Sequence, residues 1–112
     1  VSNQTGSFTG VTCPGLSAYT PTCTASGADS ALTANFSVGT SGSLAAGQIV
    51  YIPFKTTFGS APVCVFSPAT AAAAGLTGVY ITTTTSGVTL MLTTATSVTS
   101  GQTYSWFVQC RQ

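Results

Sequence analysis

Apolar and polar side chains alternate along most of the chain from residue 32 onward. The first such run is residues 32–38, in which apolar side chains occupy every second position: Leu32, Ala34, Phe36 and Val38. This period of two is typical of a β-strand with one buried face. Comparable runs cover residues 48–54, 63–66, 79–85, 88–94 and 103–110. Together they predict an all-β fold of about six short strands, either an antiparallel β-sandwich or a small barrel.

The alternation also predicts which side chains face the core. Residues 48–54 place Val50, Ile52 and Phe54 on one face, and Ile49 and Tyr51 on the other. Pro53 has no amide hydrogen for a ladder, so we expect this strand at a sheet edge or Pro53 at a strand end. The last run places Tyr104, Trp106, Val108 and Cys110 on one face, opposite Phe107. Ser86-Gly87 between two alternating runs predicts a hairpin.

The segment "APVCVFSPATAAAAGL", residues 61–76, begins as an apolar strand and breaks at a Ser-Pro pair. We expect Val63 and Val65 to lie in the core. The alanine-rich part has Pro68, which suits a first helical position, and Gly75, which suits a helix end. Because so short a helix is marginal on its own, we expect a helical turn or a packed loop. Alanine lets chains approach closely, so this segment is also a candidate contact with a neighbouring subunit.

Residues 1–30 lack a sustained period and are rich in Ser, Thr, Gly and Pro. We therefore expect an extended N-terminal arm or loop region over residues 1–30, followed by a β-sandwich domain over residues 31–112.

The composition is unusual in its lack of charge. The charged residues are Asp29, Lys55 and Arg111, 3% of the chain, whereas about 25% is ordinary for soluble proteins. With 44% hydrophobic residues the sequence does not resemble a disordered chain. The net charge of +1 gives little self-repulsion, which favours permanent assembly. The alternative is a secreted monomer kept soluble by Thr and Ser.

Charge and hydropathy also bear on partners. Two basic residues cannot neutralise a track of phosphates, so nucleic acid is excluded as a partner. No apolar run approaches the roughly 18 residues of a membrane span, so we expect no membrane insertion.

The four cysteines, Cys13, Cys23, Cys64 and Cys110, form an even set, for which three pairings are possible. Cys13 and Cys23 enclose a turn-rich loop, which favours a bridge between them. Cys64 and Cys110 lie in two predicted strands, which favours a cross-strand bridge, with a buried free thiol as the alternative for Cys64. The wide spacings and the absence of histidine argue against zinc, so we expect no metal or other cofactor.

The inventory of side chains argues against catalysis. The chain has no histidine and a single acidic residue, so paired carboxylates are impossible and a Ser or Cys nucleophile lacks its usual base. Asp29 stands in "SGADSA", a turn context in which Asp often bonds nearby backbone. We expect no enzymatic activity unless a neighbouring chain completes a site.

Aromatic residues are the remaining candidates for a binding site: Tyr51, Tyr80, Tyr104 and Trp106. If they were exposed together, they would form a platform for sugar rings. A single Trp in the last strand of a small β-domain is more often part of the core, and we favour that role.

Four pieces of the sequence carry a family resemblance: "GADSALTANFSVGT", "FGSAPVCVFSPATAAAAGL", "VYITTTTSGVTL" and "GQTYSWFV". From Gly27 to Val108 the chain resembles the small β-domains at the C-termini of bacteriophage tail fibres and among phage head-decoration proteins. The resemblance implies an all-β domain that works as a homotrimer on a virion surface.

Two departures from the family refine this expectation. Four cysteines are more than the family usually has, which suggests covalent reinforcement within or between subunits. No repetitive shaft precedes the domain, which fits a decoration, or cement, protein bound to a major capsid protein or another virion protein. The alternatives are the receptor-binding tip of a tail fibre, recognising a host surface glycan or protein, and a secreted lectin-like monomer.

Overall fold

The computed structural model describes residues 8–76 and 78–111. Its strands are β1 (Pro21–Ala28), β2 (Ala31–Val38), β3 (Gly42–Leu44), β4 (Gly47–Pro53), β5 (Val63–Pro68), β6 (Val79–Thr83), β7 (Gly87–Leu92), β8 (Thr96–Val98) and β9 (Thr103–Arg111). Its helices are a 3-10 helix, η1 (Pro14–Tyr19), and a one-turn α-helix, α1 (Ala71–Ala74). All six predicted strands are present, and β1, β3 and β8 are additional to them.

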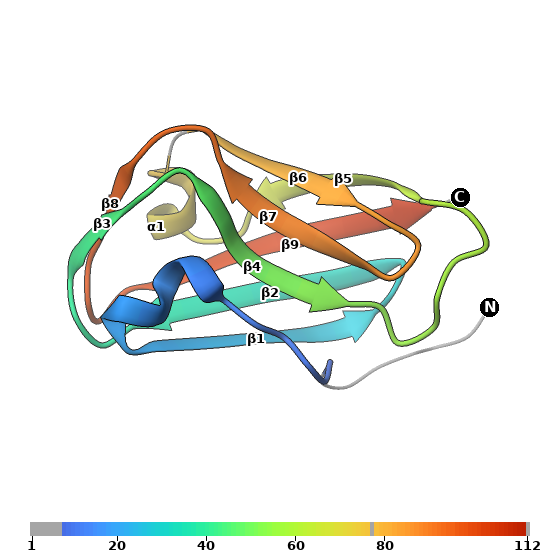
Figure 1. Cartoon of the computed structure of the whole chain (residues 1–112), viewed down its shortest axis with the longest axis horizontal. Coiled ribbons are helices and arrows are strands. Elements are labelled where there is room, and N and C mark those ends of the chain that lie inside the picture. Colours follow the sequence, from blue (N-terminus) through green and yellow to red (C-terminus); the bar gives the residue numbers. More distant parts are fainter. Residues whose placement is uncertain (1–7, 77, 112) are drawn as a thin grey trace.

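The strands form two facing sheets and a small third one (Figure 1). The four-stranded sheet has the order β1-β2-β9-β5, and the three-stranded sheet has the order β4-β7-β6. The pair β3-β8 closes one end of the molecule. Every strand pair is antiparallel. The predicted all-β, sandwich-like fold is therefore confirmed, and β6 and β7 form the hairpin predicted at Ser86-Gly87.

Three aromatic rings form a column in the core. The ring of Phe36 on β2 stacks on Tyr104 at a centroid distance of 4.8 Å, and on Trp106 at 5.6 Å. All three side chains are buried. The Tyr104 hydroxyl accepts a hydrogen bond from the Thr99 backbone N–H at 2.9 Å, which satisfies its polar end. The preference for a core role of Trp106 is therefore confirmed.

Strand β4 departs from simple alternation. Ile49 and Val50 are adjacent, yet both are buried, because the pairing with β7 shifts register between Gln48 and Val50. A bulge of this kind inserts a residue and turns two neighbouring side chains toward the core. The prediction that Ile49 faces away from Val50 is wrong for this reason. Pro53 ends β4, an outer strand of its sheet, as predicted.

The expected arm differs in the structure over residues 8–30. Strand β1 pairs with β2 along its whole length, and Phe8, Leu16 and Ala25 are buried with the core. Alternation is weak in β1 because its inward positions carry small side chains, such as Cys23 and Ala25, between Thr and Ser. Residues 1–7 of the expected arm lie outside the described residues.

The alanine-rich segment forms a helical turn that ends at Gly75, as expected, but the turn begins at Ala71. The expected place of Pro68 at the start of the helix is wrong, because Pro68 ends β5 and Thr70 caps the helix. The Thr70 side chain accepts a hydrogen bond from the Ala73 N–H at 3.2 Å, and its hydroxyl donates to the Thr103 carbonyl at 2.9 Å. Ala73 is buried, whereas Ala71 and Ala74 are exposed. The turn therefore packs beside β9 on one side and faces solvent on the other.

Candidate interaction surface on the four-stranded sheet

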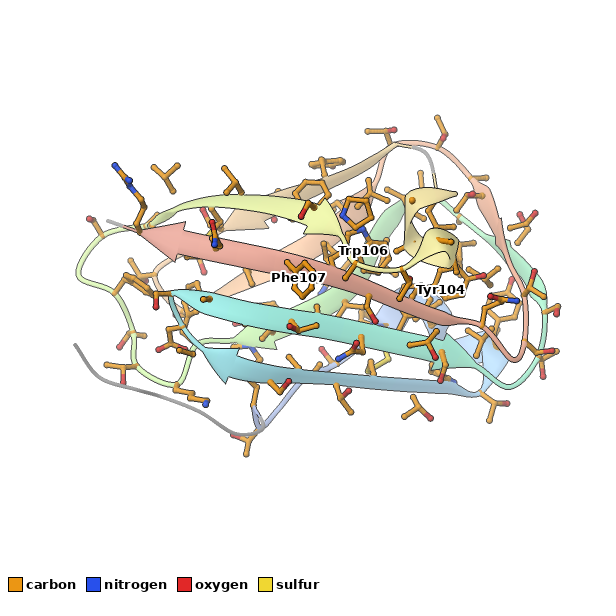
Figure 2. The ribbon with its side chains drawn as sticks, turned by 180° about the vertical axis from the view of Figure 1, so that it is seen from behind. Tyr104, Trp106 and Phe107 are labelled. Atoms are coloured by element: carbon orange, nitrogen blue, oxygen red, sulfur yellow. A yellow bond between two sulfur atoms is a disulfide. The ribbon has the colours of Figure 1, made fainter. Side chains whose placement is uncertain are left out.

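The outer side of β9 carries an exposed aromatic ring. Strand alternation turns Tyr104 and Trp106 toward the core and Phe107 away from it. Phe107 is 53% exposed, whereas Trp106 is 1% exposed. Figure 2 looks onto this outer side and shows Phe107 in the middle of β9. The exposed Phe107 ring is the first of the side chains that make up the candidate interaction surface.

The neighbouring strand β5 adds two exposed aliphatic side chains. Val63 is 69% exposed and Val65 is 61% exposed. The prediction that they lie in the core is wrong, because Cys64 and Phe66 occupy the inward positions of β5. All four positions of this run are apolar, so its pattern does not determine which side faces inward. The pairing of β5 with β9 determines which side faces inward.

The pairing of β5 with β9 brings these side chains together. Val65 lies opposite Gln109, Val63 opposite Arg111, and Ser67 opposite Phe107. All of these side chains stand on the outer side of the sheet, because residues opposite each other in a ladder share a face. We call this surface the β5–β9 face, and it consists of Val63, Val65, Ser67, Phe107, Gln109 and Arg111.

Open grooves run along this face. One, of about 550 Å³, is lined by Ser30, Val63, Val65, Gln109, Cys110 and Arg111. A second, of about 300 Å³, is lined by Val65, Phe66, Ser67, Phe107 and Gln109. A third, of about 250 Å³, is lined by Ala31, Leu32, Thr33, Phe107, Val108 and Gln109. The Phe107 ring therefore separates the second and third grooves. Side chains of a partner could enter the grooves on either side of it.

A disulfide fixes the two strands of this face to each other. Cys64 and Cys110 are direct cross-strand neighbours with a Cα–Cα distance of 4.0 Å. The Cys110 N–H donates to the Ser30 carbonyl at 3.0 Å, away from β5. The bridge therefore occupies a non-hydrogen-bonded position, where cross-strand side chains are closest. It joins the outer strand β5 covalently to β9 beneath the exposed valines.

The second disulfide joins Cys13, just before η1, to Cys23 of β1. Both bridges that the sequence favours are thus confirmed, and Cys64 is not a free thiol. Disulfides persist in oxidising compartments, so the chain belongs to an extracellular or otherwise non-reducing environment. Among residues 8–76 and 78–111, no group of three or more potential metal ligands lies together.

The acidic residue lies in the interior. Asp29 is 5% exposed in the turn between β1 and β2, as its sequence context predicts. Its bonds reach farther than expected: its carboxylate accepts from the backbone N–H groups of Lys55 at 2.8 Å and Thr56 at 2.9 Å. The Lys55 ammonium donates to the Gly27 carbonyl at 2.6 Å and lies 4.7 Å from the centre of the Phe8 ring. Asp29 and Lys55 thus join the first turn to the segment after β4.

The four aromatics considered as a sugar platform are not brought together. Tyr104 and Trp106 are buried in the core. Tyr80, 39% exposed, lies on β6, and the half-buried Tyr51 lies on β4, at opposite edges of the other sheet. The exposed ring that belongs to a candidate surface is Phe107. Its alternation against Trp106 was the available signal, because it placed Phe107 on the outer side.

Comparison with protein-family models, with curated proteins and with solved structures finds no match for the chain. Within the part of the chain that the structure describes, no helix is long and apolar enough to cross a membrane. The candidate surface therefore rests on its own geometry.

Proposed function

We propose that the chain is a non-enzymatic structural protein of a bacteriophage virion surface. In this role it is a trimeric capsid decoration protein that attaches to another virion protein and stabilises the head. The observation that carries this proposal is the joint exposure of Val63, Val65 and Phe107 on the β5–β9 face. Contiguous exposed apolar side chains mark interaction sites in soluble proteins.

The construction of the β5–β9 face supports a lasting attachment. Its apolar side chains stand on strands, and a disulfide between Cys64 and Cys110 joins those strands. A surface that is already ordered loses little conformational entropy on binding, so more of the contact energy becomes affinity. Disulfides also suit a protein that stays outside the reducing cytoplasm.

The sparse charge supports assembly at high local density. A net charge of +1 produces little repulsion between copies or against a capsid. The homotrimer and the head location come from the sequence resemblance over residues 27–108. A bound decoration protein stabilises the assembled capsid by mass action, because it binds the assembled form and not the separate subunits.

One observation favours a second function, the receptor-binding tip of a tail fibre. The Phe107 ring is exposed beside the amide of Gln109 and the hydroxyl of Ser67. An aromatic face with amide and hydroxyl groups at its rim suits a sugar ring, which is apolar on its faces and polar at its edge. In that role the same surface would contact a host glycan.

Electron microscopy of particles of the phage whose genome encodes this chain separates the two functions. Particles are labelled with gold-coupled antibodies raised against the folded chain. The decoration role predicts label over the head, and the second role predicts label at the fibre tips. Particles without label would contradict both. Equilibrium sedimentation of the chain tests the trimer, which has three times the 11.2 kDa chain mass.

A further inference from the structure

The β5–β9 face carries a single charge at its end. Arg111 stands opposite Val63 and lines the same groove as Val65 and Gln109. Among the described residues no carboxylate is available to it, since Asp29 is the chain's one acidic residue, is buried and accepts bonds from Lys55 and Thr56. The face thus presents an exposed guanidinium beside exposed aliphatic side chains.

This charge distribution argues against a second copy as the occupant. A guanidinium that is covered by a partner loses its water and needs an acceptor of opposite charge in return. Asp29 of another copy is 5% exposed, so another copy offers no exposed side-chain carboxylate to Arg111. A symmetric contact through this face would also bring two Arg111 side chains into one interface, which raises the repulsion.

The surroundings of Arg111 favour a protein segment over a sugar. Val63 and Val65 supply aliphatic contact surface next to the charge, and the groove between them and Arg111 is larger than the two grooves beside Phe107. Phe107 lies four residues from Arg111, about 13 Å along the strand at the usual rise per residue. An extended segment of about five residues spans that length and presents side chains at the same period of two.

We infer that the β5–β9 face docks an extended segment of a different protein, in which a carboxylate for Arg111 is flanked by apolar side chains for Val63, Val65 and Phe107. This inference rests on the proposed function and specifies its partner. The carboxylate would accept from the planar guanidinium, a pairing in which two parallel hydrogen bonds are common. The trimer then forms through another surface and leaves this face open.

The test uses fluorescence anisotropy with the full chain and three labelled probes. Two are end-capped seven-residue peptides with valine at positions 2 and 6 and threonine at the odd positions, so that position 4 shares a face with both valines. Position 4 is glutamate in one peptide and glutamine in the other. The third is a trimer of galacturonic acid, an acidic sugar. The variants are Arg111→Gln, Arg111→Lys and Val65→Ser, with Tyr80→Ser on the other sheet as a matched surface control. Circular dichroism verifies that each variant is folded.

The inference predicts that the glutamate peptide binds at least threefold more tightly than the glutamine peptide, and that added salt reduces this preference. Arg111→Gln removes the preference. Arg111→Lys retains part of it, because lysine keeps the positive charge but cannot donate two parallel hydrogen bonds to a carboxylate. Val65→Ser weakens both peptides, and Tyr80→Ser weakens neither.

Three results would overturn the inference: equal binding of the two peptides, binding of the sugar probe in preference to both, or self-association that Val65→Ser abolishes in sedimentation. The particle labelling described above tests the proposed function independently of the peptide binding. A chain absent from particles that still selects the glutamate peptide contradicts the proposed function alone. A chain present on particles that shows no such selection contradicts this inference alone.

Discussion

Cys64 and Cys110 lie directly opposite each other in the β5–β9 ladder, 4.0 Å apart at Cα, and their bridge faces the interior. Cys110 is 3% exposed, so its cross-strand partner also points inward. Since side chains alternate along a strand, Val63 and Val65 must point outward on either side of Cys64. The disulfide therefore links β5 covalently to β9 and accounts for the outward position of the two valines.

Removing this disulfide should destabilise the chain more than removing the other one. The Cys64–Cys110 bridge spans a sequence separation of 46 and the Cys13–Cys23 bridge a separation of 10. The chain-entropy relation gives about 4 kcal/mol for the first and about 3 kcal/mol for the second. Urea unfolding of the double variants Cys64→Ala/Cys110→Ala and Cys13→Ala/Cys23→Ala measures the difference. A larger loss for the second pair would contradict the relation for this fold.

The aromatic column predicts unequal effects of two phenylalanines. Phe36 stacks between Tyr104 and Trp106 and is 1% exposed, so Phe36→Ala should cost about 3–5 kcal/mol of unfolding free energy. Phe107→Ala removes an exposed ring and should cost less than about 1 kcal/mol. Denaturant titration followed by Trp106 fluorescence measures both. Similar losses would mean that Phe107 is packed in solution.

Replacing Asp29 should lower the free energy of unfolding and accelerate hydrogen exchange in the segment after β4. Asp29→Ala leaves the Lys55 and Thr56 N–H groups without their carboxylate acceptor, which should cost roughly 2–3 kcal/mol. Asp29→Asn keeps an acceptor oxygen and should cost less. Hydrogen exchange should accelerate at the amides of residues 55 and 56 before it does at β9. Unchanged exchange at these amides would show that other contacts hold the segment after β4.

The sequence predicts most of this fold because most strands have one polar side. In β2 the alternation is strict, and in β9 Phe107 is the one apolar side chain at an outward position, so the inward positions of Phe36 and Trp106 follow from the pattern. Strand β1 escapes prediction because small and hydroxylated side chains blur its two sides. The bulge in β4 escapes because Ile49 and Val50 are both apolar, and no local signal marks the shift in register.

The candidate surface was harder to predict than the fold. Its aliphatic part depends on whether Val63 and Val65 or Cys64 and Phe66 face inward, and either choice buries apolar groups. Only the pairing with β9, reinforced by the disulfide, decides between them. Phe107 was placed on the outer side from sequence, yet its value as a contact depends on the exposed valines beside it.

Hydroxyl-radical footprinting of assembled particles tests the role of the β5–β9 face most directly. Phe107 and Tyr80 are both exposed in the chain, on opposite sheets, so Tyr80 serves as an internal reference. If the face is the attachment surface, oxidation of Phe107 falls several-fold in particles relative to the isolated chain, and Tyr80 changes little. Equal oxidation of Phe107 in particles and in the isolated chain would contradict the proposed attachment through this face.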